Sequence, residues 1–288
     1  IDYVCHEIGH QFGAGHTYYN DCFGAKVADD YEPGSASTIM GYAGICAPNV
    51  QSNSDAYFHA RSLEQMTAQI ASHSCETEVS HTNTEPIANA GGNYTIPKST
   101  PFILNGSGSS DLDSADVLTY CWEQYNNDGA FTQPPVATNT GGPVFRSLTP
   151  TVDPYRTFPN LNAIINNQTP TWEVLPSVAR TLNFRLTVRD NNSNAPQTNS
   201  ANAIINVGTA GPFVVTSPNT SVVWYAGETK AITWNVAGTN STTYSQTVNI
   251  KLSTDGGFTY PITLANAVPN SGTTNIVVPN AIGKNNRI

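Results

Sequence analysis

The most constraining feature of this 288-residue chain is the run HEIGHQFGAGH at residues 6–16, in which three histidines and a glutamate have fixed spacing. His6 and His10 are four residues apart, so on a helix their imidazoles project from one face on successive turns. Gly13 allows the backbone to leave that helix with a positive φ, and the following turn returns His16 to the same side. The run therefore predicts a helix and a tight turn that bring three imidazoles together.

Three imidazole nitrogens around one point are a ligand set that Zn²⁺ accepts, with a fourth position left open for water or a substrate. We therefore predict His6, His10 and His16 as zinc ligands. Glu7 is predicted not as a ligand but as the general base that accepts a proton from water activated by the metal. The alternative is a surface helix that carries scattered histidines without a metal.

A second motif, STIMGY at residues 37–42, follows the third histidine. Together the two motifs resemble the catalytic domain of metzincin metalloproteases of the reprolysin-like (M12B-type) family, especially its secreted bacterial members. The resemblance implies that Met40 lies in the Met-turn and forms an apolar floor beneath the metal. Thr17 follows the third histidine, where reprolysins usually have Asp, so the chain departs from the family pattern at that position.

The resemblance also assigns roles to the residues after the methionine. Gly41, Tyr42 and Ala43 are expected to line the pocket for the substrate side chain that follows the cleaved bond. It further implies a twisted sheet and additional helices before the zinc helix, whereas this sequence begins five residues before His6. We therefore expect more chain before Ile1 in the natural protein.

Residues 1–76 are thus predicted to be the C-terminal portion of a metzincin catalytic domain, with the zinc helix, the Met-turn and a terminal helix. That terminal helix is expected at Phe58–His73, because Leu63, Met66 and Ile70 recur at helical spacing on it. Its charged residues Arg61 and Glu64 are expected to be simply solvated.

The composition is that of an extracellular protein rich in β-structure. Charged residues make up 11% of the chain, against a typical value of about 25%, whereas hydrophobic residues at 39% suffice for packed cores. The net charge of −9 comes with only 12 Lys and Arg, and without a basic patch the chain is not expected to bind nucleic acid. No apolar run is long enough to span a membrane. We expect a secreted protein, extracellular or attached to the cell surface.

Five cysteines fit disulfides formed in an oxidising compartment. Cys22 and Cys46 bracket the loop from the third histidine to the end of the Met-turn, and we predict that they pair. The resemblance implies that Cys75 bonds upstream, either to Cys5 or to a residue outside this sequence. Cys121 lies on an expected strand and is interpreted as a small buried hydrophobic side chain.

The rest of the chain alternates apolar residues with Gly, Pro and Asn turns, which is typical of β-sandwiches. A polar linker at residues 77–85 leads to one expected sandwich at 86–208 and a second at 209–288. The first is similar to PKD-like, Ig-fold modules of secreted bacterial hydrolases, but it carries a long insertion, Asn126–Arg180, expected to be an ordered loop. The second stops where a further strand begins, so we expect it to be truncated.

Within the second sandwich, strands are expected at Val222–Glu228 and Ala231–Val236. The segment Val248–Tyr260 resembles a hairpin of the Asp-box kind, in which an Asp and a Gly fix a tight turn. Trp224 and Trp234 are interpreted mainly as core aromatics, with stacking on a sugar as the alternative.

Asp111, Asp113 and Asp116 fall in one turn of the first sandwich. Their carboxylates, with backbone carbonyls, could offer Ca²⁺ the oxygen ligands it prefers. Short acidic residues also form good turns without an ion, and three carboxylates do not fill a shell of about 6–8 oxygens. Both interpretations stay open from the sequence.

Taken together, the sequence predicts a secreted, multidomain zinc metalloendopeptidase: the C-terminal part of an α/β metzincin domain followed by two all-β, Ig-like modules. It would act on protein or peptide substrates, while the β modules bind a surface polymer or a secretion or anchoring partner. One alternative is an extracellular adhesin or scaffold with a vestigial protease domain. Another is that these residues serve only as non-catalytic modules of a complex. The retained Glu7 disfavours the vestigial protease, since loss of the base is the simplest route to inactivity.

Overall fold

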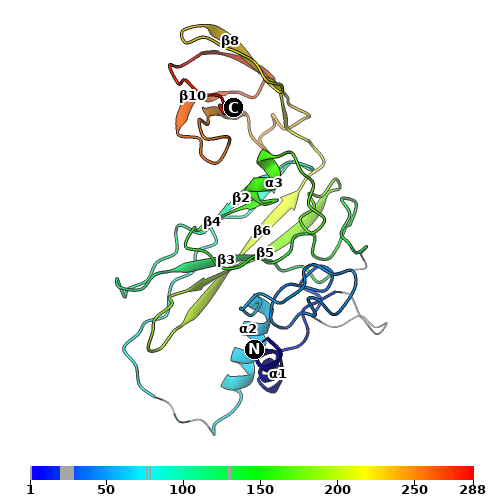
Figure 1. Ribbon diagram of the computed structural model, residues 1–288, viewed down its shortest axis with the longest axis vertical. Helices are drawn as coiled ribbons and strands as arrows, with labels where there is room; N and C mark the ends of the chain where they lie inside the picture. The colour runs from blue at the N-terminus through cyan, green and yellow to red at the C-terminus, as the bar shows by residue number, and fades with distance from the viewer. Residues whose placement is uncertain (1, 20–28, 76, 78, 129–130) are drawn as a thin grey trace.

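The computed structural model describes residues 2–19, 29–75, 77, 79–128 and 131–288. A small helical portion at the N-terminus, a β-sandwich and a second β-sandwich follow one another along the long axis (Figure 1). The described chain is therefore mostly β-structure with few helices. None of the helices in these residues has the length and apolar character needed to cross a membrane.

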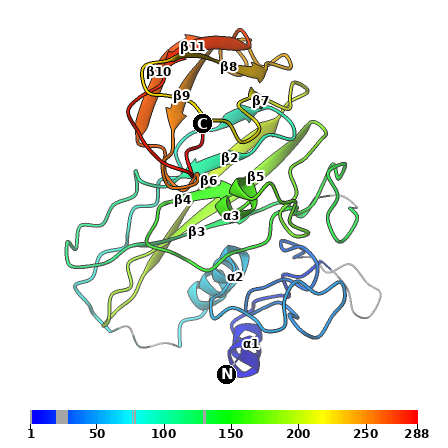
Figure 2. The same ribbon diagram turned by 45° about the horizontal axis from the view of Figure 1, so that its top comes forward.

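The N-terminal portion holds two helices, α1 (Asp2–Gln11) and α2 (Ala60–Ala71), joined by irregular chain. Helix α2 forms where the terminal helix is predicted, but its apolar residues are poorly covered: Leu63 and Met66 are half-buried and Ile70 is 50% exposed. Both views place α2 between α1 and the first sandwich (Figures 1 and 2).

The expectation that Arg61 and Glu64 are simply solvated is wrong. Glu64 accepts a hydrogen bond from the Tyr125 hydroxyl at 2.5 Å and pairs with Arg185 at 3.4 Å, both in the first sandwich. Arg61 pairs with Asp29 at 2.8 Å. The charged residues are engaged because the polar face of α2 packs against the sandwich.

The first sandwich has a four-stranded and a two-stranded sheet. The larger has the order β1-β6-β5-β3, with β5 antiparallel to both neighbours and β1 parallel to β6. Its strands are β1 (Tyr94–Ile96), β3 (Thr119–Gln124), β5 (Arg180–Arg189) and β6 (Thr198–Val207). The smaller sheet pairs β2 (Phe102–Asn105) with β4 (Tyr155–Phe158). Apolar side chains fill the space between the sheets, among them Phe145, Phe158, Leu182, Phe184 and Leu186.

In its described residues the insertion Asn126–Arg180 is ordered, as expected, but it is more than a loop. It supplies β4, one of the two strands of the smaller sheet, and the short helix α3 (Leu161–Ile165). Phe145 and Phe158 from this segment are almost wholly buried. The insertion is therefore part of the sandwich core, because its apolar residues complete the packing between the sheets.

The second sandwich pairs a three-stranded sheet, β11-β8-β7, with a two-stranded sheet, β10-β9. Its strands are β7 (Val214–Ser217), β8 (Thr229–Asn235), β9 (Thr247–Leu252), β10 (Ile262–Pro269) and β11 (Thr273–Val277). Strand β8 forms where one is expected. The strand expected at Val222–Glu228 does not form, because a turn between Tyr225 and Glu228 interrupts it and Val223 is 80% exposed.

The Asp-box turn after β9 has the structural role that the sequence predicts. The Asp255 carboxylate accepts hydrogen bonds from the backbone N–H groups of Phe258 and Thr259 and from the hydroxyls of Thr259 and Ser253. These bonds, the one from the Thr259 hydroxyl first, lower the pKa of Asp255. Trp234 is a buried core residue that donates to Asn270 at 2.7 Å, so its side chain serves packing.

Candidate metal centre

The three histidines are brought together by the end of helix α1. The Gly13 N–H donates to the His10 carbonyl at 3.0 Å and the Ala14 N–H to the Gly9 carbonyl at 2.9 Å, which is the Schellman arrangement. Gly13 adopts φ +85°, as predicted from its place in the run. The backbone thus reverses after the helix and places His16 beside His6 and His10.

The Nε2 atoms of the three histidines lie 3.1, 3.1 and 3.2 Å apart. Zinc–nitrogen bonds of about 2.0–2.1 Å in tetrahedral geometry require nitrogens about 3.3 Å apart, so the spacing fits one ion. The Nδ1 of His6 is 2.7 Å from the Ile39 carbonyl and that of His10 is 2.8 Å from the Ala14 carbonyl. Because a carbonyl oxygen only accepts hydrogen bonds, the Nδ1 of His6 and that of His10 carry the proton, and the Nε2 of each presents a lone pair. The donor set fits a metal ion.

Burial favours the neutral form of His6 and His16, which is the form that a metal requires. Desolvation is the largest cause of the lowered pKa of His6, and it lowers the pKa of His16 to about 4. The neighbouring His10 lowers both further. Glu7 acts in the opposite direction on both, and its own side chain is exposed on α1 beside the histidines.

The Met-turn packs directly under α1. Met40 is fully buried, and a Cβ placed at Gly9 would come within 2.5 Å of the Met40 Sδ. The glycine between the two helical histidines therefore allows the close approach of Met40. Together with Ala14 and Ile39, Met40 forms the small core beneath the histidines.

Of the three predicted pocket residues, Tyr42 contacts the histidines. Its ring centroid lies 4.7 Å from that of His16 and 5.7 Å from that of His6, and it stacks on Tyr18 at 4.5 Å. Gly41 and Ala43 are buried within the turn. The role of the three residues in binding substrate stays a prediction.

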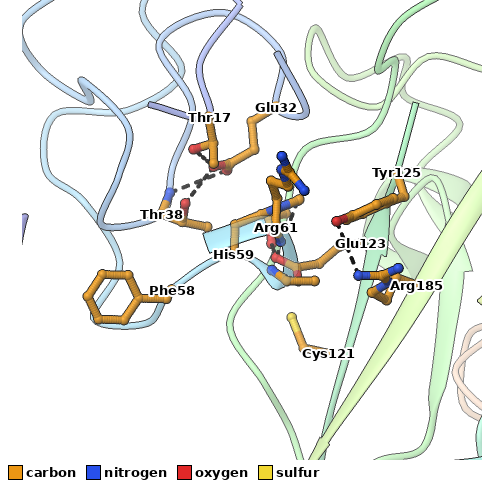
Figure 3. Close-up of polar contacts among 12 residues, drawn as sticks. Thr17, Glu32, Thr38, Phe58, His59, Arg61, Cys121, Glu123, Tyr125 and Arg185 are labelled. Atoms are coloured by element: carbon orange, nitrogen blue, oxygen red, sulfur yellow. Dashed lines mark hydrogen bonds and ion pairs between the residues drawn. The ribbon is translucent and has the colours of Figure 1, made fainter. Parts of the chain in front are cut away.

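Sequence reasoning missed Glu32, which joins the third-histidine segment to the Met-turn. Its carboxylate is 1% exposed and accepts hydrogen bonds from the hydroxyls of Thr17 and Thr38 at 2.7 and 2.5 Å (Figure 3). It also accepts the Ser37 N–H at 3.1 Å. Thr17 thus reaches a carboxylate supplied from another segment. No motif marks Glu32, because its partners are brought together only by the fold.

The cysteines follow the sequence interpretation in part. Cys121 is buried and free, as predicted, and its thiol donates to the Leu148 carbonyl. Cys5 and Cys75 are also free, so the pairing between them is not formed. Cys46 is buried and disulfide-bonded, whereas Cys22 lies outside the described residues, and their pairing stays a prediction.

The structure brings Asp111, Asp113 and Asp116 together, with one carboxylate oxygen from each within 4.8 Å of the others. Asp113 accepts from the backbone N–H and hydroxyl of Thr84, and Asp116 accepts from Asn192 at 3.1 Å. One buried oxygen of Asp111 has no hydrogen-bond partner in the described part of the chain. The other oxygen of Asp111 accepts the Asp113 N–H at 2.8 Å, so protein donors contact all three carboxylates, and calcium binding stays a prediction.

If these aspartates hold Ca²⁺, calcium should stabilise the protein after it has been stripped of metal and reloaded with zinc. At a free calcium concentration a hundred times its dissociation constant, the gain is roughly 2.7 kcal/mol in the free energy of unfolding. Differential scanning calorimetry during a CaCl₂ titration measures it. Asp113→Ala should abolish the gain, and Asp153→Ala, in a turn elsewhere in the sandwich, should retain it. A parent that melts alike with and without calcium makes the cluster an ordinary turn.

Comparison with known proteins gives a likeness for the N-terminal portion. Residues 1–69 match the model of the metallopeptidase family M12B, reprolysin-like, which is less than half of the chain. No curated protein matches the chain.

Two of the matching solved structures cover about two thirds of this chain. They are fibronectin(III)-like modules of Clostridium thermocellum CbhA (10% identity, 67% of this chain and 78% of that chain, TM-score 0.22) and a chimeric titin Z1Z2 tandem (12%, 69% and 86%, TM-score 0.19). TM-scores this low do not establish a shared fold. The family likeness of residues 1–69 is the one that bears on the metal centre.

Proposed function

We propose that this protein is a zinc-dependent metalloendopeptidase of the reprolysin-like kind. The observation that carries the proposal is the convergence of the His6, His10 and His16 Nε2 atoms to within 3.2 Å, with Nδ1 of His6 and His10 turned to backbone carbonyls. The family match over the same residues and the exposed Glu7 beside the histidines support it.

Bound at the three histidines, Zn²⁺ would supply Lewis-acid polarisation of the scissile carbonyl and of water. The chain supplies the proton transfers. Glu7 accepts a proton from the attacking water and delivers it to the leaving amine as the peptide bond breaks. His6 and His10 are held in one tautomer by the Ile39 and Ala14 carbonyls, so their orientation is fixed before substrate arrives. Tyr42 is assigned to the wall of the substrate pocket, with Gly41 and Ala43 shaping the turn behind it.

The two sandwiches are assigned to binding a surface polymer or an anchoring partner of a secreted enzyme, with the low charge content of 11% in support. A cavity of about 650 Å³ lies against β9 of the second sandwich and is also lined by Thr95, Pro97 and Thr100 of the first. The aromatic side chains Phe213, Trp234, Tyr244 and Tyr260 help to line it. The competing function, an adhesin with a vestigial protease portion, is disfavoured by the intact Glu7 and the complete histidine set.

The proposal is tested by metal content and hydrolysis together. We expect one zinc per chain by inductively coupled plasma mass spectrometry of protein purified without added metal. The natural full-length protein should cleave an unfolded substrate such as reduced casein. Treatment with 1,10-phenanthroline should remove both the metal and the cleavage, and added ZnCl₂ should restore them. A folded full-length protein that binds no zinc and leaves casein uncut would support the adhesin, and equal cleavage without zinc would refute the zinc mechanism.

A further inference from the structure

The N-terminal portion and the first sandwich share a buried polar interface centred on Glu123 of strand β3 (Figure 3). Glu123 is 0% exposed. One of its carboxylate oxygens accepts the Ala60 N–H at the start of α2 at 2.8 Å, and the other accepts the Ser147 hydroxyl at 2.6 Å. His59, 1% exposed, places its Nε2 3.7 Å from the same carboxylate. A buried carboxylate with these partners is a fixed point between the two parts of the protein.

From this point one chain of contacts leads to a metal ligand. The Ser147 hydroxyl lies 2.6 Å from the Tyr57 hydroxyl. The Tyr57 carbonyl accepts the Ile39 N–H at 3.1 Å, and the Ile39 carbonyl faces His6 Nδ1 at 2.7 Å. Ile39, whose carbonyl orients His6, is therefore held by Tyr57, and the Tyr57 hydroxyl is in turn held by Ser147 of the sandwich.

A second chain of contacts leads toward the third histidine. The Ser147 carbonyl accepts the Ser37 hydroxyl at 3.2 Å, and the Ser37 N–H donates to Glu32. Glu32 in turn accepts the Thr17 hydroxyl at 2.7 Å, and Thr17 directly follows His16. All the residues along this path are nearly or wholly buried, so water does not compete for these hydrogen bonds.

We propose that Glu123 is a positioning residue for the metal ligands, and that the first sandwich is a working part of the metal centre in addition to any tethering role. Acting through Ser147, Glu123 holds Tyr57 against the Met-turn and Ser37 within it. Through these two residues it fixes the orientation of His6 and of the segment after His16. This inference rests on the proposed function for the identity of the metal, whereas the hydrogen-bond network stands without it.

The test compares three variants of the chain. Glu123→Ala removes the fixed point, and Glu123→Gln retains one acceptor oxygen while replacing the other with a donor. The matched control is Glu173→Ala. Glu173 is also buried in this sandwich, but its partners Arg156 and Asn160 lie within the sandwich itself. Two quantities are measured: the zinc dissociation constant by competition with a chromogenic chelator, and hydrogen exchange of the Met-turn amides in the metal-free protein.

For Glu123→Ala we expect a zinc dissociation constant raised roughly tenfold, at the lower end of the effect of residues that orient metal ligands because it acts through intermediates. The Ile39 amide should also exchange faster in the metal-free protein. Glu123→Gln should give an intermediate result. Glu173→Ala should lower the melting temperature and leave both readouts at the parent values. If Glu123→Ala does not fold, Tyr57→Phe serves in its place, since it removes only the hydroxyl that contacts Ser147.

The inference is overturned if Glu123→Ala, or Tyr57→Phe in its place, binds zinc within twofold of the parent and protects Ile39 equally. It is also overturned if Glu173→Ala changes the zinc dissociation constant and the exchange of Ile39 as much as Glu123→Ala does. Both variants would then act only by destabilising the sandwich. A parent that binds no zinc refutes the proposed function instead. In that case the exchange of Ile39 alone decides whether Glu123 organises the Met-turn.

Discussion

Glu7→Ala is expected to retain zinc and lose peptide hydrolysis. The three imidazoles and the carbonyls that orient His6 and His10 are untouched, so the metal content should equal that of the parent. General acid–base catalysis contributes roughly 10²–10⁴-fold, and here one carboxylate serves two proton transfers, so the loss in kcat should lie at or above about 10⁴-fold. Cleavage of a quenched fluorescent peptide by the natural full-length protein measures the rate, and elemental analysis measures the metal.

Because Glu7 is exposed, its replacement should not alter the melting temperature. Glu85→Ala, which removes another exposed glutamate far from the histidines, is the control and should keep full activity. If Glu7→Ala retained the parent rate with zinc bound, the assignment of the general base would be refuted and the peptidase mechanism with it.

Local sequence sufficed for the metal centre because its determinants are local. Two histidines one helical turn apart and a glycine that ends the helix bring the three imidazoles together. The orientation of His6 depends in addition on the distant Ile39 carbonyl. The same holds for the Asp255 turn, whose partners lie within four residues.

What the sequence could not reveal depends on contacts between distant segments. Glu64 and Arg61 read as surface charges on a helix, yet Glu64 meets Arg185 across 121 positions because α2 packs on the sandwich. Glu123 lies on a strand, where the alternation of side chains indicates only whether a residue points into the sandwich or out of it, and not which residue it contacts. Its partner Ala60 becomes visible once β3 and α2 are adjacent.

The strand predicted at Val222–Glu228 shows the opposite error, because the sequence predicted an element that the structure does not form. The apolar residues of Val222–Glu228 have high strand propensity, but a strand also requires a neighbour to pair with. The turn at Tyr225–Glu228 removes that opportunity, and Val222 and Val223 are exposed. High strand propensity was therefore not enough to form a strand at these residues without a neighbouring strand to pair with.

His10→Ala should lose zinc and activity together, in contrast to Glu7→Ala. The Nε2 of His10 lies 3.1 Å from those of both His6 and His16, so it is one of the three nitrogens that would hold the ion. Its loss leaves two imidazoles, which hold the ion poorly. Residues that merely orient ligands change metal affinity roughly 10–100-fold, so removal of a ligand should exceed the upper end of that range.

The same substitution should also remove the stabilisation that zinc confers. At a free zinc concentration a thousand times the dissociation constant, this is roughly 4.1 kcal/mol in the free energy of unfolding. The melting temperature of the parent should therefore rise with added zinc, whereas that of His10→Ala should not, as calorimetry with and without ZnCl₂ can show. His81→Ala is the control, because His81 is exposed in the linker and should leave zinc binding unchanged. Full zinc content in His10→Ala would mean that the ion binds elsewhere, and the three-histidine centre would have to be abandoned.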